Sequence, residues 1–265
     1  MKYIFIILLF FSISIKSVFA NEFSDVLELE LVNGWRQPNG INYGGLKIKL
    51  SPGWKTYWRH PGETGFSPEL DWTGSKNLSA AKVLWPHPVI FNDNGLLSFG
   101  YKDYVILPIE FTPINTAKLI KAKLNIKLGV CEKLCVPVSR SLTVKLRASK
   151  TDLDPEIVEY MNKLPKLVSG HELKNVKCEF KVDGKNLIFR SEIEFYDRDI
   201  SFKAAVVELP ESNFWFALPK IERTSNSLKI ISKVEQSEDG IFVLNRDGII
   251  ITLIGKSESL YLEGC

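Results

Sequence analysis

The feature that most constrains this chain is a two-residue alternation of apolar and polar side chains. Between Val26 and about Leu146 it recurs in the segments VLELELV, LKIKL, YVILPIEF, KLNIKLGV and SLTVKL, which turn signals separate. A period of two is the spacing of a β-strand that buries one face. The pattern shows no sustained alternation of strands with helices, which disfavours a Rossmann or thioredoxin fold. The sequence therefore predicts an all-β protein.

One stretch, TDLDPEIVEYMNKLP at 151–165, follows a helical pattern instead. Asp154 suits the N-cap of a helix, Pro155 suits its first turn, and Glu156 complements the helix dipole there. The apolar residues at 157, 160, 161 and 164 fall on one helical face. We expect a short helix that connects two parts of the chain.

Strand patterns resume after this stretch, and the Asp-Gly pairs that begin at 183, 239 and 247 are typical of hairpin turns. The length of the chain accommodates two ordinary domains. We therefore predict two β-sandwich domains joined by a short helix. The expected boundaries are 21–150 for the first sandwich, 151–169 for the helical linker, and 170–265 for a second sandwich of unknown role.

Residues 1–20 are typical of a secretory signal peptide. A positive start is followed by the apolar run IFIILLFFSISI and by VFA, which ends at Ala20. The run is too short to span a membrane, and no later stretch approaches the ~20 apolar residues that a span needs. Without the lysines of the leader the net charge falls from +3 to +1, so a nucleic-acid partner is not expected. We expect an exported protein that does not span the membrane, in a compartment where disulfides form.

The sequence GVCEKLCVPV places Cys131 and Cys135 at the two ends of a short hairpin connection, close enough to be bridged. In the chain-entropy model a bridge across so short a loop contributes only about 2 kcal/mol, against roughly 4.6 kcal/mol for one from Cys178 to Cys265. Tight loops also tend to be strained and easier to reduce. From the spacing alone, the pair is either a minor hairpin staple or a redox pair.

The other two cysteines have a different setting. Cys178 shares the two-residue spacing of Val176, Phe180 and Val182, so its side chain should face the core of the second sandwich. Cys265 is the last residue and follows SLYLEG, which suits a closing strand. We predict a structural disulfide between Cys178 and Cys265, with free thiols or a bond between chains as the alternatives.

The three histidines, His60, His87 and His171, show no ligand spacing with the cysteines, so no metal site is predicted. His60 and His87 are expected in Pro-rich loops, where a solvated side chain is the ordinary state. Help with proton transfer is the alternative role for these two side chains.

Aromatic residues are dense in PGWKTYWRHPGETGFSPELDW at 52–72, and LLSFGYKDY at 96–104 adds more. On Gly- and Pro-rich loops such residues usually serve local packing. They also suit a sugar- or peptide-binding platform, or a shield over a reactive disulfide.

Four motifs, GWKTYWRHPGETG, WPHP, FGYKDYVILP and GVCEKLCVP, occur here in the order and spacing of a known family. They resemble the N-terminal periplasmic domain of the thiol:disulfide interchange protein DsbD, and in particular its ScsB-like branch. The resemblance covers about residues 25–147. It implies an immunoglobulin-like sandwich in which Cys131 and Cys135 are the redox pair.

A short cap segment covers the disulfide in that family. By resemblance, the SFGY stretch at 98–101 corresponds to the cap, which implies that Phe99 shields the disulfide with Tyr101 beside it. Tyr57 matches an aromatic residue of the family that lines the same pocket. The best-known members have a longer insertion between the two cysteines, so the loop geometry is expected to differ here.

The resemblance implies an exported thiol–disulfide exchange protein in the periplasm. It would take electrons from a separate membrane-embedded thiol reductase and pass them to a thioredoxin-like acceptor protein. In that family the second cysteine of the pair forms the bond to the acceptor, which implies this role for Cys135. No cofactor is expected. The alternative is a non-enzymatic periplasmic binding, adaptor or chaperone-like module whose hairpin disulfide is only structural.

Overall fold

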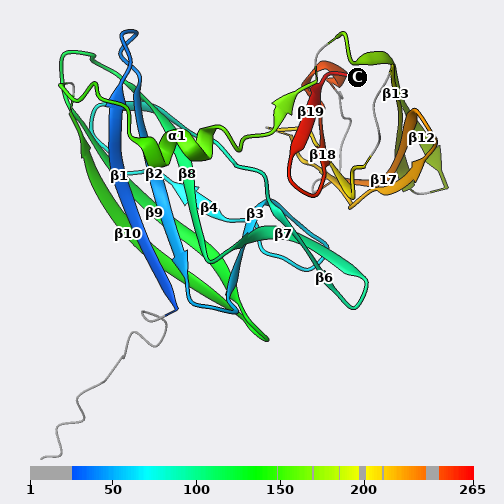
Figure 1. Cartoon of the computed structure of the whole chain (residues 1–265), viewed down its shortest axis with the longest axis horizontal. Coiled ribbons are helices and arrows are strands. Elements are labelled where there is room, and N and C mark those ends of the chain that lie inside the picture. The colour runs from blue at the N-terminus through cyan, green and yellow to red at the C-terminus, as the bar shows by residue number, and fades with distance from the viewer. Residues whose placement is uncertain are drawn as a thin grey trace, which may run out of the picture.

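A computed structural model describes residues 26–147, 149–168, 170–184, 186–196, 201–210, 212–236 and 245–265. The predicted signal peptide and the Asp-Gly pair at 239–240 lie outside the described residues. The chain forms two β-sandwiches of mainly antiparallel strands, with one short helix in the connection between them (Figure 1), which confirms the predicted fold class. No described helix is both long and apolar enough to cross a membrane.

The first sandwich packs two sheets against one another. One has the strand order β1 (Leu27–Arg36), β2 (Asn42–Leu50), β8 (Tyr104–Pro113), β5 (Leu78–Val83). The other has the order β10 (Cys135–Leu146), β9 (Ile120–Cys131), β3 (Lys55–Gly62), β7 (Leu96–Lys102), β6 (Val89–Asp93), and β4 (Glu69–Asp71) also pairs with β9. The alternating residues Leu124, Ile126 and Leu128 of β9 lie in the core between the sheets, as the sequence pattern predicts.

The second sandwich has its own core. One sheet has the order β11 (Lys166–Leu167), β19 (Ser259–Glu263), β18 (Ile250–Ile254), β14 (Ala204–Glu208). The other has the order β12 (Leu173–Asp183), β13 (Asn186–Phe195), β17 (Ser227–Gln236), β15 (Phe214–Phe216), and β16 (Lys220–Arg223) also pairs with β17. Cys178 is bonded to Cys265, and both pack against this core.

Two of the predicted Asp-Gly turns fall in the described residues, and their outcomes differ. Asp183 ends β12 and Gly184 follows it in the turn to the paired strand β13, with a φ of +62° that suits a tight hairpin. The hairpin predicted at Asp247 and Gly248 is wrong, because these residues belong to a one-turn 3₁₀ helix, Arg246–Gly248. The side chain of Asn245 accepts a hydrogen bond from the Asp247 amide and caps this turn instead.

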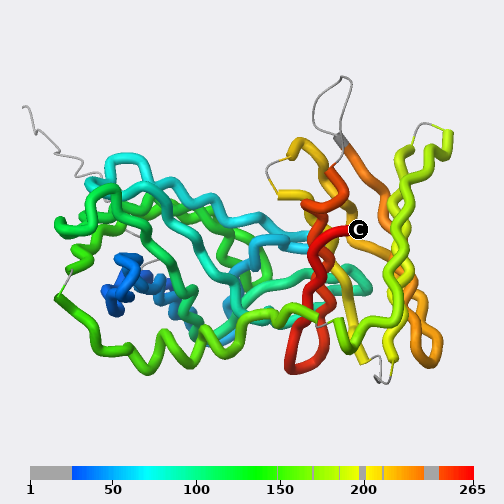
Figure 2. Tube along the Cα trace, turned by 90° about the horizontal axis from the view of Figure 1, so that it is seen from above, coloured from blue at the N-terminus to red at the C-terminus, as the bar shows by residue number. Residues whose placement is uncertain are grey.

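The predicted helix is α1, Pro155–Met161. The Asp154 side chain accepts hydrogen bonds from the amides of Glu156 and Ile157, which confirms its N-cap role. Ile157 is fully buried with Trp35 and Ile106, so the helix covers part of the first sandwich. Figure 2 shows the connection running along one side of this sandwich before it enters the second.

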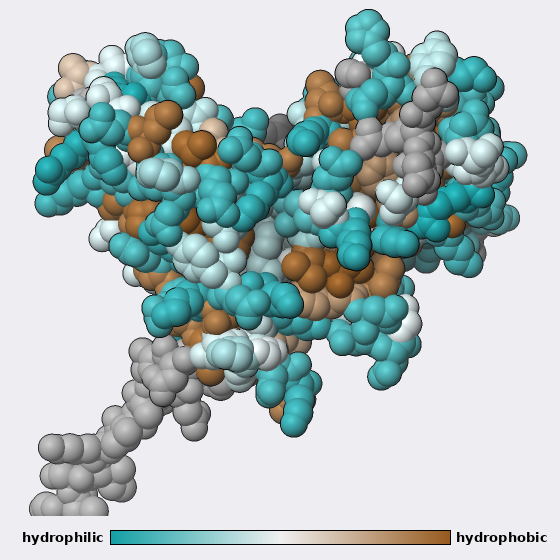
Figure 3. Space-filling view, viewed as in Figure 1, coloured by the Kyte–Doolittle hydropathy of each residue, from teal (hydrophilic) through white to brown (hydrophobic). Residues whose placement is uncertain are grey.

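An ion pair joins the two sandwiches. Arg59 of β3 donates from Nε and Nη2 to both carboxylate oxygens of Glu208 on β14, over distances of 2.8–3.1 Å. Its guanidinium also lies 3.9 Å from the ring centroid of Trp58. Apolar residues Ala204, Val206 and Ile254 of the second sandwich continue the core of the first. The two lobes in Figure 3 are therefore held by both polar and apolar contacts.

Two histidines lie at this interface, which corrects their expected solvated state. His60 is part of β3 rather than a loop, is only 4% exposed, and stacks on Trp215 with ring centroids 4.7 Å apart. His87 lies in a loop, where its Nδ1 is 2.7 Å from the Ser259 hydroxyl. Burial lowers the pKa of both side chains below the ordinary value of 6.5. Both therefore favour the neutral form.

Because the folded pKa values of His60 and His87 lie below 6.5, the unfolded chain binds more protons at mildly acidic pH. Their contribution to stability is complete above about pH 6.5 and is lost as the pH falls toward the folded pKa values. We expect the melting temperature to fall between pH 7.5 and 5. In the His60→Gln/His87→Gln double variant this fall should be smaller. Equal pH dependence of the two proteins would contradict the assignment.

Candidate functional site

The candidate site is the disulfide at the tip of the β9–β10 hairpin. Cys131 ends β9, Cys135 begins β10, and the two residues are direct partners in the antiparallel register. Their Cα atoms are 4.1 Å apart, and the sulfurs are bonded. The bond therefore joins residues that the strand ladder already holds together.

The two cysteines differ in accessibility. Cys131 is only 1% exposed, whereas Cys135 is an exposed residue. Leu134, which precedes Cys135 at the tip, is 81% exposed. A partner protein that approaches the hairpin tip therefore meets Cys135 first.

Tyr57 of β3 contacts both sulfurs. Its hydroxyl oxygen lies 3.1 Å from Cys131 Sγ and 3.3 Å from Cys135 Sγ. Burial, with a smaller effect from Asp93, raises the pKa of this hydroxyl, so it keeps its proton at neutral pH. A protonated hydroxyl in this position can donate a hydrogen bond to a thiolate formed on either cysteine.

Glycines on neighbouring segments make room for the Tyr57 ring. A Cβ at Gly65 would lie 2.5 Å from Tyr57 Cδ1, and one at Gly129 would lie 3.3 Å from Tyr57 Cε2. Gly100 is paired with Tyr57 in the β3–β7 ladder. The ring is thus seated against two positions that lack a side chain, Gly65 and Gly129, whereas Gly100 makes room for the backbone of β3.

Phe66 is a neighbour of this site that the sequence reasoning missed. A Cβ at Gly129 would lie 3.2 Å from Phe66 Cδ2, so the Phe66 ring packs over the strand next to Tyr57. Phe66 is 60% exposed. It belongs to the aromatic run at 52–72 and directly follows the first family motif, which ends at Gly65. This place beside the motif was the sequence signal that could have identified Phe66 as a neighbour of the site.

Phe99 and Tyr101, the expected shield of the disulfide, lie in the core of the first sandwich instead. Both are at most 4% exposed and belong to the first hydrophobic core, and the Tyr101 hydroxyl donates to the Pro86 carbonyl at 2.9 Å. Gly100 between them is the residue of β7 that pairs with Tyr57. Since neighbouring residues of a strand face opposite sides, Phe99 and Tyr101 face the core, whereas Tyr57 faces the disulfide.

A lysine also lies near the disulfide. Lys55 is the register partner of Cys131 across the β3–β9 ladder. Its ammonium is 2.7 Å from Asp93 Oδ2 and 4.7 Å from the centroid of the Phe91 ring. Only 15% of its side chain is exposed. The carboxylate of Asp93 balances its charge, so the site has little net charge from this pair.

The remaining candidate residues form no second site with the hairpin cysteines. The Cys178–Cys265 disulfide lies in the other sandwich, where Cys178 Sγ is 3.5 Å from the Ser191 hydroxyl. His171 is exposed. Among the residues that the structure describes, no group of three or more histidine, cysteine or acidic side chains is arranged to hold a metal ion.

Comparisons with known proteins agree with the motifs. Residues 32–146 match the sequence model of the N-terminal domain of the thiol:disulfide interchange protein DsbD. The N-terminal periplasmic domain of ScsB from Proteus mirabilis has a similar structure, with a TM-score of 0.64 and 22% sequence identity over 90% of this chain and 92% of that one. No curated protein sequence matches the chain significantly. Residues 32–146 are therefore similar in sequence to the N-terminal domain of DsbD, within a chain whose fold is that of the ScsB periplasmic domain.

Proposed function

We propose that the chain is a thiol–disulfide exchange protein whose working groups are Cys131 and Cys135. The observation that carries this proposal is the disulfide between a buried and an exposed cysteine, with the Tyr57 hydroxyl within 3.3 Å of both sulfurs. The match of residues 32–146 to a family of disulfide interchange proteins supports it.

The exchange has two steps that conserve electrons. In the reduced protein, the Cys135 thiolate attacks one sulfur of an acceptor disulfide, and the other acceptor sulfur leaves as a thiolate. The Cys131 thiolate then attacks Cys135 Sγ, which re-forms the Cys131–Cys135 bond and releases the second acceptor sulfur. Two electrons pass to the acceptor. A donor dithiol restores the reduced pair by the same exchange in reverse.

The location of Cys135 supports its assignment as the attacking residue. It is exposed at the hairpin tip, whereas Cys131 is buried and its Sγ lies 3.1 Å from the Tyr57 hydroxyl. The hydroxyl of Tyr57 stabilises whichever sulfur is ionised, because a hydrogen bond to a charged group is stronger than one to a neutral group.

We further propose periplasmic partners on both sides of the exchange. The donor is a separate membrane-embedded thiol reductase, and the acceptor is a thioredoxin-like periplasmic protein, as the family resemblance implies. Export requires that residues 1–20 act as a cleaved signal peptide. The Cys178–Cys265 disulfide has no part in the exchange, because it lies in the second sandwich and is half-buried against that core.

Replacement of Tyr57 by Phe tests the hydrogen bond to the thiolate. Loss of a hydrogen bond to a charged group is worth about 1.5–3 kcal/mol, so the pKa of the reduced pair should rise by roughly one to two units. The pH dependence of alkylation measures it. Tyr101→Phe is the matched control, because its hydroxyl bonds the Pro86 carbonyl inside the core. An unchanged thiol pKa in Tyr57→Phe would assign this hydroxyl to packing alone.

Two phenylalanine variants locate the shield of the disulfide. Phe66→Ala should speed reduction of Cys131–Cys135 by dithiothreitol with little change in stability, because Phe66 is largely exposed. Phe99→Ala should lower the free energy of unfolding by about 3–5 kcal/mol, because it empties a core position. If Phe99→Ala alone speeds reduction while folded, the shield lies at Phe99 as the family resemblance implies.

Trapping of mixed disulfides tests the function itself. Cys131→Ala leaves Cys135 without its resolving partner, so a soluble thioredoxin-like protein should accumulate on Cys135 in cells. Cys135→Ala should instead capture the donor on Cys131, less efficiently because that sulfur is buried. Non-reducing gels and mass spectrometry identify the products. If neither variant traps a protein and both leave the thiols of exported proteins unchanged, the binding or adaptor alternative replaces exchange.

A further inference from the structure

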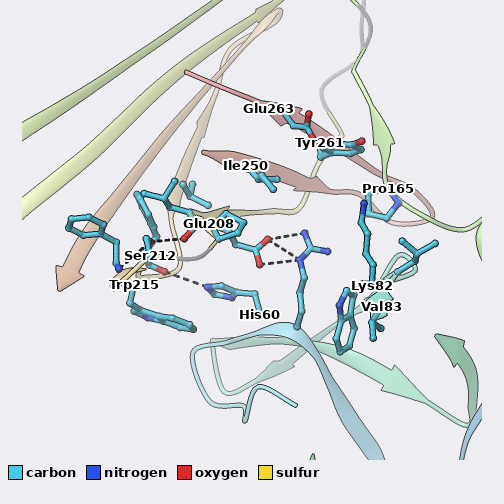
Figure 4. A pocket seen from close by; sticks show the side chains of 18 of the residues that line it. His60, Lys82, Val83, Pro165, Glu208, Ser212, Trp215, Ile250, Tyr261 and Glu263 are labelled. Atoms are coloured by element: carbon cyan, nitrogen blue, oxygen red, sulfur yellow. Dashed lines mark hydrogen bonds and ion pairs between the residues drawn. The ribbon is translucent and has the colours of Figure 1, made fainter. Parts of the chain in front are cut away.

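A cleft of about 620 Å³ lies between the two sandwiches, and the exchange chemistry does not use it. Its floor is the ion pair of Arg59 and Glu208. In Figure 4, Trp215 and His60 lie on one side of this pair, and Lys82 and Val83 lie on the other.

The end of β5 exposes an unpaired strand edge in this cleft. β5 is the last strand of its sheet and pairs only with β8 among the described strands. The Leu84 amide donates to the Pro108 carbonyl at 2.8 Å, so in an antiparallel ladder the backbone groups of Val83 and Trp85 point away from β8. Both residues line the cleft, and among the described residues neither forms a backbone hydrogen bond on this outward side. The free edge ends at His87, whose amide donates to the Lys163 carbonyl of the linker at 2.7 Å.

The walls of the cleft are mainly apolar and aromatic. Trp85 comes from the first sandwich, and Phe214, Trp215 and Tyr261 come from the second. Trp215 is 44% exposed although it stacks on His60, so one face of its ring remains available. Aromatic side chains of this kind form pockets for the apolar side chains of a ligand.

We infer that the cleft binds an extended polypeptide segment, which adds to β5 as a further strand. A free strand edge holds such a segment through main-chain hydrogen bonds, and the flanking pockets select every second side chain. The segment therefore carries apolar or aromatic side chains at alternate positions. The charged side chains that line the cleft balance one another, because Arg59 pairs with Glu208 and Lys82 is offset by Glu263, so the bound segment carries no net charge.

The test uses a capped synthetic heptapeptide in which threonine alternates with valine and phenylalanine, titrated into the full chain by calorimetry. One further version is N-methylated on its odd-numbered residues, and another is N-methylated on its even-numbered residues. Only the version that blocks the amides facing β5 should lose affinity, by about tenfold or more. The peptide contains no cysteine, so its binding is independent of the proposed exchange, and either proposal can fail without the other.

Two variants of β5 separate strand addition from simple apolar capture. Val83→Pro removes the outward amide but keeps the ladder to β8, since an edge strand tolerates proline where the amide faces outward. We expect about fivefold weaker binding. Val83→Thr keeps the amide and is the matched control. If Val83→Pro does not fold, the N-methylated peptides decide alone.

An aromatic pair of variants tests the wall. Trp215→Ala should weaken binding about fivefold or more, whereas Tyr196→Ala removes an exposed aromatic side chain outside the cleft and should have no effect. Thermal unfolding checks that each variant is folded. The proposal is overturned if the parent peptide does not bind at about 1 mM. It is also overturned if both N-methylated peptides bind like the parent, or if folded Val83→Pro or Trp215→Ala keeps full affinity.

Discussion

The alternation of side chains along a β-strand is the constraint on which the rest of this molecule depends, and strand β3 shows it most directly. Tyr57 faces the hairpin disulfide, its neighbour Trp58 fills the first core, and Arg59 reaches Glu208 of the second sandwich. Because β3 pairs with both β9 and β7, its backbone is held on two sides and fixes where these three side chains start. Strand β3 therefore contributes both to the site around the Cys131–Cys135 disulfide and to the interface between the two sandwiches.

The interface between the sandwiches owes its orientation and its stability to different contacts. The Arg59–Glu208 pair is bidentate, and its side chains are 27% and 19% exposed. Exposed ion pairs contribute about 0–1 kcal/mol, and burial adds a desolvation penalty, so this pair mainly fixes geometry. The apolar residues that continue the first core supply stability through burial, at about 25 cal/mol per Å². The second sandwich is therefore oriented by charge and held by apolar packing.

Sequence reasoning identified the features that local chemistry controls. Periodicity indicated the strands, Asp154 and Pro155 indicated the helix, and the spacing of Cys131 and Cys135 indicated a bridged hairpin. It failed where a role depends on contacts between distant segments. Phe99 lies in a stretch that suits a loop shield but faces the core, and His60 is buried against Trp215 and Phe216, which are far along the chain.

The two disulfides differ in what their opening does to the fold. The β9–β10 ladder runs from the pair Ile120–Leu146 to the pair Cys131–Cys135, so backbone hydrogen bonds hold the hairpin whether or not the sulfurs are joined. In contrast, the bond between Cys265 and Cys178 of β12 joins residues that are 87 positions apart in the sequence. Reduction of this bond would raise the conformational entropy of the unfolded chain far more than reduction of the hairpin bond. The hairpin bond can thus open and close with the fold intact, which is what an exchange site requires, while the other bond serves best when it stays closed.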